Sequence, residues 1–171
     1  MGHQTASFAR EQSRKRPAGI GELLISDDPG ETLIAYSLGS CIGLALFDPE
    51  IRLAGLLHSQ LPLSKMDPAQ AERWPGRFTD TGVGLLLQEM YDRGARRARL
   101  VAKAVGGSSM LDEEGRFRIG ERNAAVVRKV LWKNDIVISG ADFGGTVSRT
   151  LSIEVGTGTV LMRAGGITTE L

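Results

Sequence analysis

The stretch CIGLALFDPEIRLAGLLH, residues 41–58, decides the fold because two apolar segments in it flank a single turn signal. Residues 42–47 and 53–58 are apolar, and Asp48 and Pro49 between them are favoured at the first two positions of a type I turn. Two short apolar segments joined by a turn predict an antiparallel hairpin.

The register of this hairpin brings two reactive side chains together. If the turn is centred between Pro49 and Glu50, opposed residues have numbers that add to 99, so Cys41 lies directly opposite His58. The Cβ atoms of directly opposed residues are about 4.5–5.5 Å apart on one face of a sheet. A four-residue loop with the same centre would keep the pairing. The register places smaller residues on the face of Cys41 (Gly43, Ala45, Ala54 and Leu56) and larger ones on the opposite, core face (Ile42, Leu44, Leu46, Leu53 and Leu57).

On both sides of the hairpin the chain alternates short apolar segments with turns, and it contains two helical patterns. Helices are predicted at 80–93 and 121–132, where apolar residues recur at helical spacing. Residues 61–78 hold three prolines and are expected to form a long loop. Further strands are predicted at residues 20–26, 31–37, 99–105, 136–141, 149–154 and 159–163. Strands outnumber helices, so the class is α+β, a single layered domain with a mixed sheet and two main helices.

The two ends of the chain are predicted to lie outside the folded domain. Residues 1–17 are polar and loosely basic, and we expect a disordered N-terminal tail there. Residues 165–171 are expected to form a frayed C-terminal tail. Two glycine pairs, at 106–107 and 144–145, are typical of turns that need a positive φ.

The composition narrows the class of protein. The chain has 171 residues, a formal net charge of +1 and one cysteine, so it has no internal disulfide and nucleic acid is not an expected partner. No apolar run approaches the roughly 20 residues of a membrane span. The N-terminus lacks the apolar region of a secretory signal. We therefore expect a cytoplasmic protein in a reducing compartment, without membrane insertion.

Few residues can carry chemistry. The histidines are His3, in the expected tail, and His58, so a structural zinc site with four Cys or His ligands cannot be assembled and no metal or cofactor is expected. The phosphate-binding and dinucleotide-binding glycine motifs are absent. Gly39 to Gly43 has the G-x-C-x-G spacing of a nucleophile elbow, but a strand rather than a helix follows Cys41, which argues against an α/β-hydrolase.

Cys41 and His58 therefore form the candidate site. An imidazole next to a thiol can take its proton, so that the thiolate attacks an amide or ester carbonyl and leaves a thioester. The turn Leu38-Gly39-Ser40 would present backbone N–H groups to the oxyanion. The alternative from composition and spacing alone is an inert buried cysteine and an unrelated histidine.

The motifs around these two residues resemble those of CheD, the chemoreceptor glutamine deamidase. The shared features are a Leu-Gly-Ser-Cys-Ile-Gly string at 38–43, the histidine seventeen residues after the cysteine, and Leu61-Pro62 just beyond it. Further blocks follow in the family's order, over about residues 19 to 163: Arg77-Phe78-Thr79-Asp80, Gly94-Ala95, Ala102-Lys103, Gly106-Gly107 with Met110, Ile119-Gly120-Glu121-Arg122-Asn123, Asp142, Gly144-Gly145, Arg149 and Thr157-Gly158.

The resemblance implies a layered α/β/β sandwich, with residues 18–164 as the CheD-like deamidase domain. It implies hydrolysis of glutamine side chains on methyl-accepting chemoreceptors, with Cys41 as nucleophile and His58 as general base. It also implies a partner, a CheC-like phosphatase.

One position departs from the family pattern. The family has a threonine six positions before the cysteine, thought to orient the histidine, and this sequence has Ala35 there. Ser37 or Tyr36 could replace it, a backbone carbonyl could hold the imidazole, or activity could be weak. Ser37, Ser40 and Gly39 are therefore the candidates for orienting or oxyanion roles.

Two other functions remain open on the sequence. The first is a weakly catalytic or non-catalytic chemotaxis adaptor that binds the phosphatase or a receptor. The second is a thiol protease or amidase that acts on small molecules, which no feature of the sequence favours. The glycine-rich surroundings of Cys41 suggest a protein substrate rather than a deep pocket.

Overall fold

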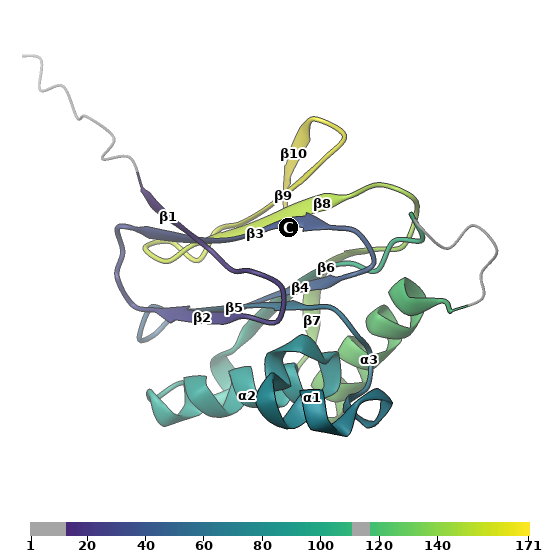
Figure 1. The fold of residues 1–171 in the computed structure, drawn as a ribbon. Helices are drawn as coiled ribbons and strands as arrows, with labels where there is room; N and C mark the ends of the chain where they lie inside the picture. The colour runs from purple at the N-terminus through teal and green to yellow at the C-terminus, as the bar shows by residue number, and fades with distance from the viewer. Residues whose placement is uncertain (1–12, 111–116) are drawn as a thin grey trace, which may run out of the picture.

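The chain folds into three layers, two β-sheets and a layer of helices (Figure 1). The structure is a computed structural model that describes residues 13–110 and 117–171. One sheet forms an outer layer, the second sheet lies in the middle, and the helices cover the free face of the second sheet. The predicted α+β class and the α/β/β layering are both confirmed.

The outer sheet has the strand order β1-β3-β8-β9-β10. Its strands are β1 (Arg14–Pro17), β3 (Glu31–Leu38), β8 (Arg149–Glu154), β9 (Val160–Ala164) and β10 (Ile167–Glu170). β1 pairs with β3 in parallel and the other pairs are antiparallel, so the sheet is mixed.

The middle sheet has the order β2-β5-β4-β6-β7. Its strands are β2 (Leu23–Ser26), β5 (Leu53–Ser59), β4 (Ile42–Asp48), β6 (Val101–Gly106) and β7 (Ile138–Phe143). The predicted hairpin is its centre, as β4 and β5, and β6 and β7 form its parallel pair. Both sheets are therefore mixed.

Two long helices, α2 (Thr79–Asp92) and α3 (Ile119–Lys133), lie on the middle sheet and confirm the two predicted helices. Their buried apolar residues are Val83, Leu86, Leu87 and Met90 on α2 and Ala124, Val127 and Leu131 on α3. Gly55 of β5 lets α2 approach closely, because a Cβ there would lie 2.7 Å from the Met90 sulfur. None of the helices in the described residues is both long and apolar enough to span a bilayer.

The predicted loop at 61–78 contains short helices instead of irregular chain. They are η1 (Ser64–Met66), α1 (Pro68–Arg73) and η2 (Pro75–Arg77), and a further turn, η3 (Arg97–Arg99), precedes β6. Two of the three prolines, Pro68 and Pro75, start helical segments, where the missing N–H costs no hydrogen bond.

Both faces of the central hairpin are buried, in two separate cores. Ile42, Leu44, Leu46, Leu53 and Leu57 face the helices, whereas Cys41, Ala45, Ala54 and Leu56 face the outer sheet. The predicted division of the hairpin into two faces is therefore confirmed. The face of Cys41, however, is a second core between the sheets.

The two expected tails differ from the structure where it describes them. Residues 14–17 form β1 because Arg14 and Arg16, two positions apart, both contact the buried carboxylate of Glu31 on β3. Residues 167–170 form β10, paired with β9. The predicted boundary at residue 17 and the frayed end are thus corrected, and residues 1–12 lie outside the described residues.

Candidate functional site

The hairpin register differs from the predicted one, and the predicted direct pairing of Cys41 with His58 is wrong. In the structure opposed residues have numbers that add to 101, so His58 lies opposite Gly43. Cys41 is two residues before Gly43 and therefore points to the same face. The two side chains are diagonal neighbours, a relation in which Cα atoms are roughly 7–8 Å apart.

The turn explains the shift. Residues 49–52 form a four-residue loop between Asp48 and Leu53, with Arg52 in the left-handed region at φ 51°. The Asp48 carboxylate is completely buried and accepts hydrogen bonds from Arg99 Nη2 at 2.7 Å and from the Arg96 N–H at 3.0 Å. These contacts fix Asp48 as the last residue of β4, and they come from a segment about 50 residues away.

Cys41 lies in a short connection, residues 39–41, that takes the chain from the outer sheet to the middle sheet (Figure 1). Two N–H groups after β6 hold this connection: Gly107 donates to the Cys41 carbonyl and Ser108 to the Gly39 carbonyl, both at 2.9 Å. A Cβ on Gly106, which has φ 118°, would lie only 2.0 Å from the Cys41 carbonyl oxygen. The approach of β6 to the cysteine therefore requires glycine.

A second connection between the sheets, residues 18–22, surrounds His58. The His58 N–H donates to the Glu22 carbonyl at 3.0 Å, and the His58 carbonyl accepts from Gly21 at 2.7 Å. The ring atom Nδ1 lies 3.1 Å from the Ala18 carbonyl oxygen. Because a carbonyl only accepts, Nδ1 carries the proton of this hydrogen bond and the neutral ring keeps its lone pair on Nε2.

The other ring nitrogen, Nε2, is buried and has no hydrogen-bond partner among the described residues. Buried polar atoms are rarely left unpaired, so an unpaired basic nitrogen on the face of the sheet that carries Cys41 needs an explanation. Catalytic hydrogen bonds are often incomplete before substrate binds. The arrangement provides a proton acceptor on the side of the molecule that carries Cys41.

Burial sets the charge state of both groups. Desolvation raises the pKa of the Cys41 thiol, and the cysteine's own N–H acts in the opposite direction. Desolvation also lowers the pKa of the His58 imidazole, against the effects of the Ala18 carbonyl and the Glu22 charge. Both shifts favour a neutral thiol beside a neutral imidazole in the free protein.

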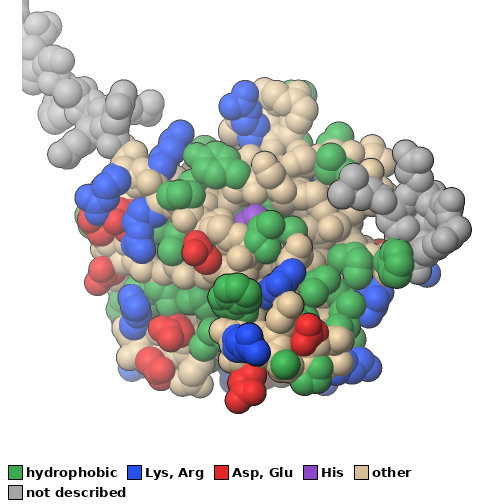
Figure 2. Space-filling view, in the orientation of Figure 1, with side chains coloured by type: hydrophobic (Ala, Val, Ile, Leu, Met, Phe, Trp, Pro, Cys, Tyr) green, Lys and Arg blue, Asp and Glu red, His purple; other side chains and the backbone are tan. Residues whose placement is uncertain are grey.

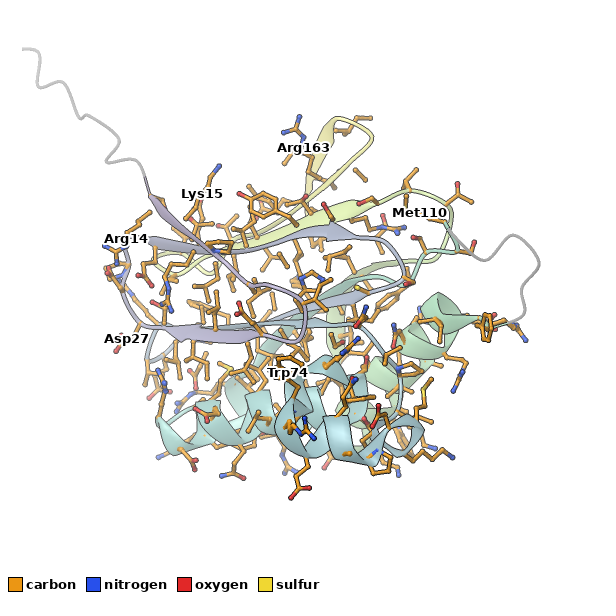
Figure 3. The ribbon with its side chains drawn as sticks, in the orientation of Figure 1. Arg14, Lys15, Asp27, Trp74, Met110 and Arg163 are labelled. Atoms are coloured by element: carbon orange, nitrogen blue, oxygen red, sulfur yellow. The ribbon has the colours of Figure 1, made fainter. Side chains whose placement is uncertain are left out.

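The pair is close to the molecular surface. Cys41 exposes 9% of its surface and His58 exposes 4%. The small area of histidine surface, purple in Figure 2, lies among apolar and uncharged atoms near the middle of the face shown. Met110, labelled in Figure 3, marks the end of the sandwich where β3 passes to β4, and a Cβ on Gly39 would lie 3.4 Å from its sulfur. Both reactive side chains are therefore largely enclosed.

The three accessory candidates have different surroundings. Ser37 is exposed, has φ 56° and lies where the pairing of β3 with β8 is irregular, and the imidazole bonds to Ala18 instead. The Gly39 N–H donates to the Ser37 carbonyl at 3.0 Å. No described group accepts a hydrogen bond from the backbone N–H of Ser40, and none but its own sulfur accepts one from that of Cys41.

The sequence pattern did not identify the polar residues that support this connection. Asn123 lies in the first turns of α3, which begins at Ile119, and its side chain donates to the carbonyls of Ser40 and Gln60. Ser108 is completely buried, and its hydroxyl has no partner among the described residues. The Ile119–Asn123 block was the available signal, but it does not reveal these long-range contacts.

Fold and site together define a class: an α/β/β sandwich with a buried cysteine–histidine pair where two connections cross between the sheets. The chain belongs to the CheD family. The family model described as "CheD chemotactic sensory transduction" matches residues 60–164.

Relatives with similar sequences cover nearly the whole chain. "Probable chemoreceptor glutamine deamidase CheD 1" of Syntrophus aciditrophicus is 41% identical over 147 residues, 86% of this chain and 92% of the relative. "Probable chemoreceptor glutamine deamidase CheD" of Solibacter usitatus is 42% identical over 153 residues, 90% of each chain. The corresponding protein of Haloarcula marismortui is 36% identical over 164 residues, 95% of this chain and 92% of the relative.

Proposed function

We propose that this protein is a protein-glutamine glutaminase that deamidates glutamine side chains of chemoreceptors. The observation that carries the proposal is the placement of Cys41 and the unpaired Nε2 of His58 on the same buried face. The names of the relatives, which are chemoreceptor glutamine deamidases, supply the substrate.

In the proposed reaction His58 Nε2 takes the proton of the Cys41 thiol as the sulfur attacks the side-chain carbonyl carbon of glutamine. The C–N bond of the tetrahedral intermediate then breaks, and the protonated imidazole gives its proton to the leaving nitrogen, which departs as ammonia. Water, deprotonated by the same nitrogen, hydrolyses the thioester to glutamate and the free thiol. The raised pKa of the thiol supports proton transfer during attack over a preformed thiolate.

We assign the oxyanion donors to the N–H groups of Ser40 and Cys41. Neither donates to a described carbonyl, and Cys41 N–H is adjacent to the attacking sulfur. Backbone N–H groups near a nucleophile are suitable donors for the charge that develops on the substrate oxygen. The Gly39 N–H, which already donates to Ser37, is the weaker candidate.

The direct test uses the cytoplasmic domain of a chemoreceptor as substrate. Deamidation adds about 1 Da per site and releases one ammonia, because the reaction replaces an amide with a carboxylate. The wild-type protein is expected to produce both signals, and the Cys41→Ala and His58→Ala variants are expected to lose them. Equal signals from wild type and Cys41→Ala would exclude the proposal.

The same proposal implies the partners and location of the protein. The proposed substrate is the cytoplasmic part of a receptor, so we place the protein in the cytoplasm. The resemblance to CheD further suggests a CheC-like phosphatase as a binding partner, which copurification with such a phosphatase would test. A purely binding adaptor is less well supported, because the Ala18 carbonyl can orient the imidazole in place of a threonine at Ala35.

A further inference from the structure

A buried chain of hydrogen bonds joins α3, α2 and the open end of the central hairpin. Asn123 on α3 is completely buried, and its Nδ2 donates to the Ser40 and Gln60 carbonyls at 2.8 Å each. Its Oδ1 accepts from the Thr79 hydroxyl at 3.1 Å. Thr79 has one hydroxyl proton, so the Ser59 hydroxyl 2.9 Å away donates to Thr79.

This chain satisfies both donors of the Asn123 amide and one of the two acceptor sites of its oxygen. The amide has two N–H donors, each with a carbonyl acceptor, and its oxygen has a hydroxyl donor. The partners also fix which end of the amide is nitrogen, since two carbonyls can only accept. Thr79 and Ser59 are completely buried, so water does not compete at this network.

The position of the network matters for the site. The paired residues of β4 and β5 end at Ile42 and Ser59, so no ladder hydrogen bond connects the chain beyond them. Ser40 and Gln60 are the carbonyls just outside this end, one residue before Cys41 and two residues after His58. By donating to both, Asn123 sets the separation of the two chain ends that carry the pair.

The network also orients the proposed oxyanion donor. The described chain has no cis peptide bonds, so the Ser40 carbonyl and the Cys41 N–H point in opposite directions from one peptide plane. Because Asn123 holds the carbonyl, it turns the Cys41 N–H away from α3 and leaves it free of carbonyl acceptors.

We propose that Asn123, supported by Thr79 and Ser59, is a positioning residue that sets the thiol of Cys41 relative to the imidazole of His58. The inference rests on the proposed function, in which these two groups exchange a proton. A network that served stability alone would change the melting temperature, but not the protonation behaviour of the thiol in protein that remains folded.

The test combines alkylation of Cys41 by iodoacetamide as a function of pH with steady-state deamidation. Asn123→Ala is expected to give an alkylation profile that coincides with that of His58→Ala. It should also lower kcat by about 100-fold with KM nearly unchanged, because a displacement of about 1 Å can cost that much. Asn134→Ala is the matched control, since among the described residues that side chain bonds only to the Val130 carbonyl within α3, and it should leave both measurements unchanged.

Thr79 provides a second pair of variants, for the case in which Asn123→Ala does not fold. Thr79→Val removes the hydroxyl at constant shape and should lower kcat, whereas Thr79→Ser keeps the hydroxyl and should restore it. Folded variants of Asn123 and Thr79 that keep the wild-type profile and kcat would overturn the positioning role alone. If wild type and His58→Ala gave the same alkylation profile, His58 would not exchange a proton with Cys41. That result would overturn both the proposed function and the positioning role.

Discussion

His58 has two ring nitrogens in different surroundings, and the difference determines what the ring can do. Nδ1 is tied to the Ala18 carbonyl, and Nε2 is buried without a described partner. The hydrogen bond at Nδ1 fixes the tautomer of the imidazole, so that Nε2 is ready to accept a proton. In other nucleophilic sites a third residue holds the histidine in this way. In this chain a backbone atom takes that role, so it does not depend on the side chain at Ala35.

The pH dependence of deamidation follows from the two shifted pKa values. Burial lowers the pKa of His58 from its ordinary 6.5, so the imidazole remains an available base below that pH. Burial raises the pKa of Cys41 from 9.0, so thiolate forms without help only above that value. We therefore expect kcat/KM to fall on the acid side, with a midpoint below pH 6.5, and to stay level up to about pH 9.

This profile is measured by following ammonia release from a receptor fragment between pH 5 and pH 9.5. An acid midpoint above 6.5 would contradict the neutral pair. It would indicate that another group controls the reaction. An ion pair of the cysteine and histidine in the free protein would instead appear as a loss of activity on the alkaline side below about pH 9, where the imidazolium deprotonates.

At the scale of elements, the close approach of β6 to the Cys41 connection is the most sensitive contact. Gly106→Ala places a Cβ 2.0 Å from the Cys41 carbonyl oxygen at φ 118°, so either β6 or the connection must move. We expect a loss of about 1–3 kcal/mol in the free energy of unfolding, and a fall in deamidation larger than the fraction unfolded explains. Urea unfolding and kcat of the same preparation measure the two effects.

Gly165→Ala is the control for backbone strain without a clash. Gly165 lies in the turn between β9 and β10 at φ 55°, and a Cβ there would meet no atom of the residues that the structure describes within 4 Å. This variant should lose about 1 kcal/mol of stability and keep its kcat. If Gly106→Ala changed stability and kcat no more than Gly165→Ala does, the close approach of Gly106 to Cys41 would not matter for deamidation.

The elements also separate what the sequence could predict from what it could not. Helices α2 and α3 were predictable because their apolar residues recur at helical spacing, and the faces of β4 and β5 because alternation is local. The hairpin register was not, because Arg96 and Arg99 bind Asp48 across about 50 residues and fix the length of the loop. Cys41 and His58 were identifiable as reactive types, but Ala18 and Asn123 act through contacts that local pattern does not encode.

At the scale of the whole molecule, Glu31 connects the first strand to the sandwich. The Ser26 hydroxyl, Arg14 and Arg16 lower the pKa of its carboxyl from 4.5 to about 2. The folded protein therefore binds fewer protons than the unfolded chain between these values. The resulting stability is present above pH 4.5 and is lost as the pH falls toward 2.

Glu31→Gln should remove this acid-dependent component and cost about 1–3 kcal/mol in the free energy of unfolding at neutral pH. Urea unfolding at pH 7 and at pH 3 measures both effects. Glu170→Gln, on the exposed strand β10, is the control and should change stability by less than about 0.5 kcal/mol. If the difference in the free energy of unfolding between wild type and Glu31→Gln were the same at both pH values, the proposed contribution of Glu31 to acid-dependent stability would be wrong.

The Ala18 carbonyl has a practical consequence for work with shortened versions of this protein. Residues 14–22 lie well before the hairpin that carries both reactive side chains, so trimming them looks harmless in a sequence comparison. A version that begins after residue 22 would keep Cys41 and His58 but lose the Ala18 carbonyl, whose hydrogen bond places the proton on Nδ1 of the imidazole. In such a truncated protein we expect thiol reagents still to modify Cys41, but kcat to be low. The low kcat could then be attributed wrongly to the choice of substrate.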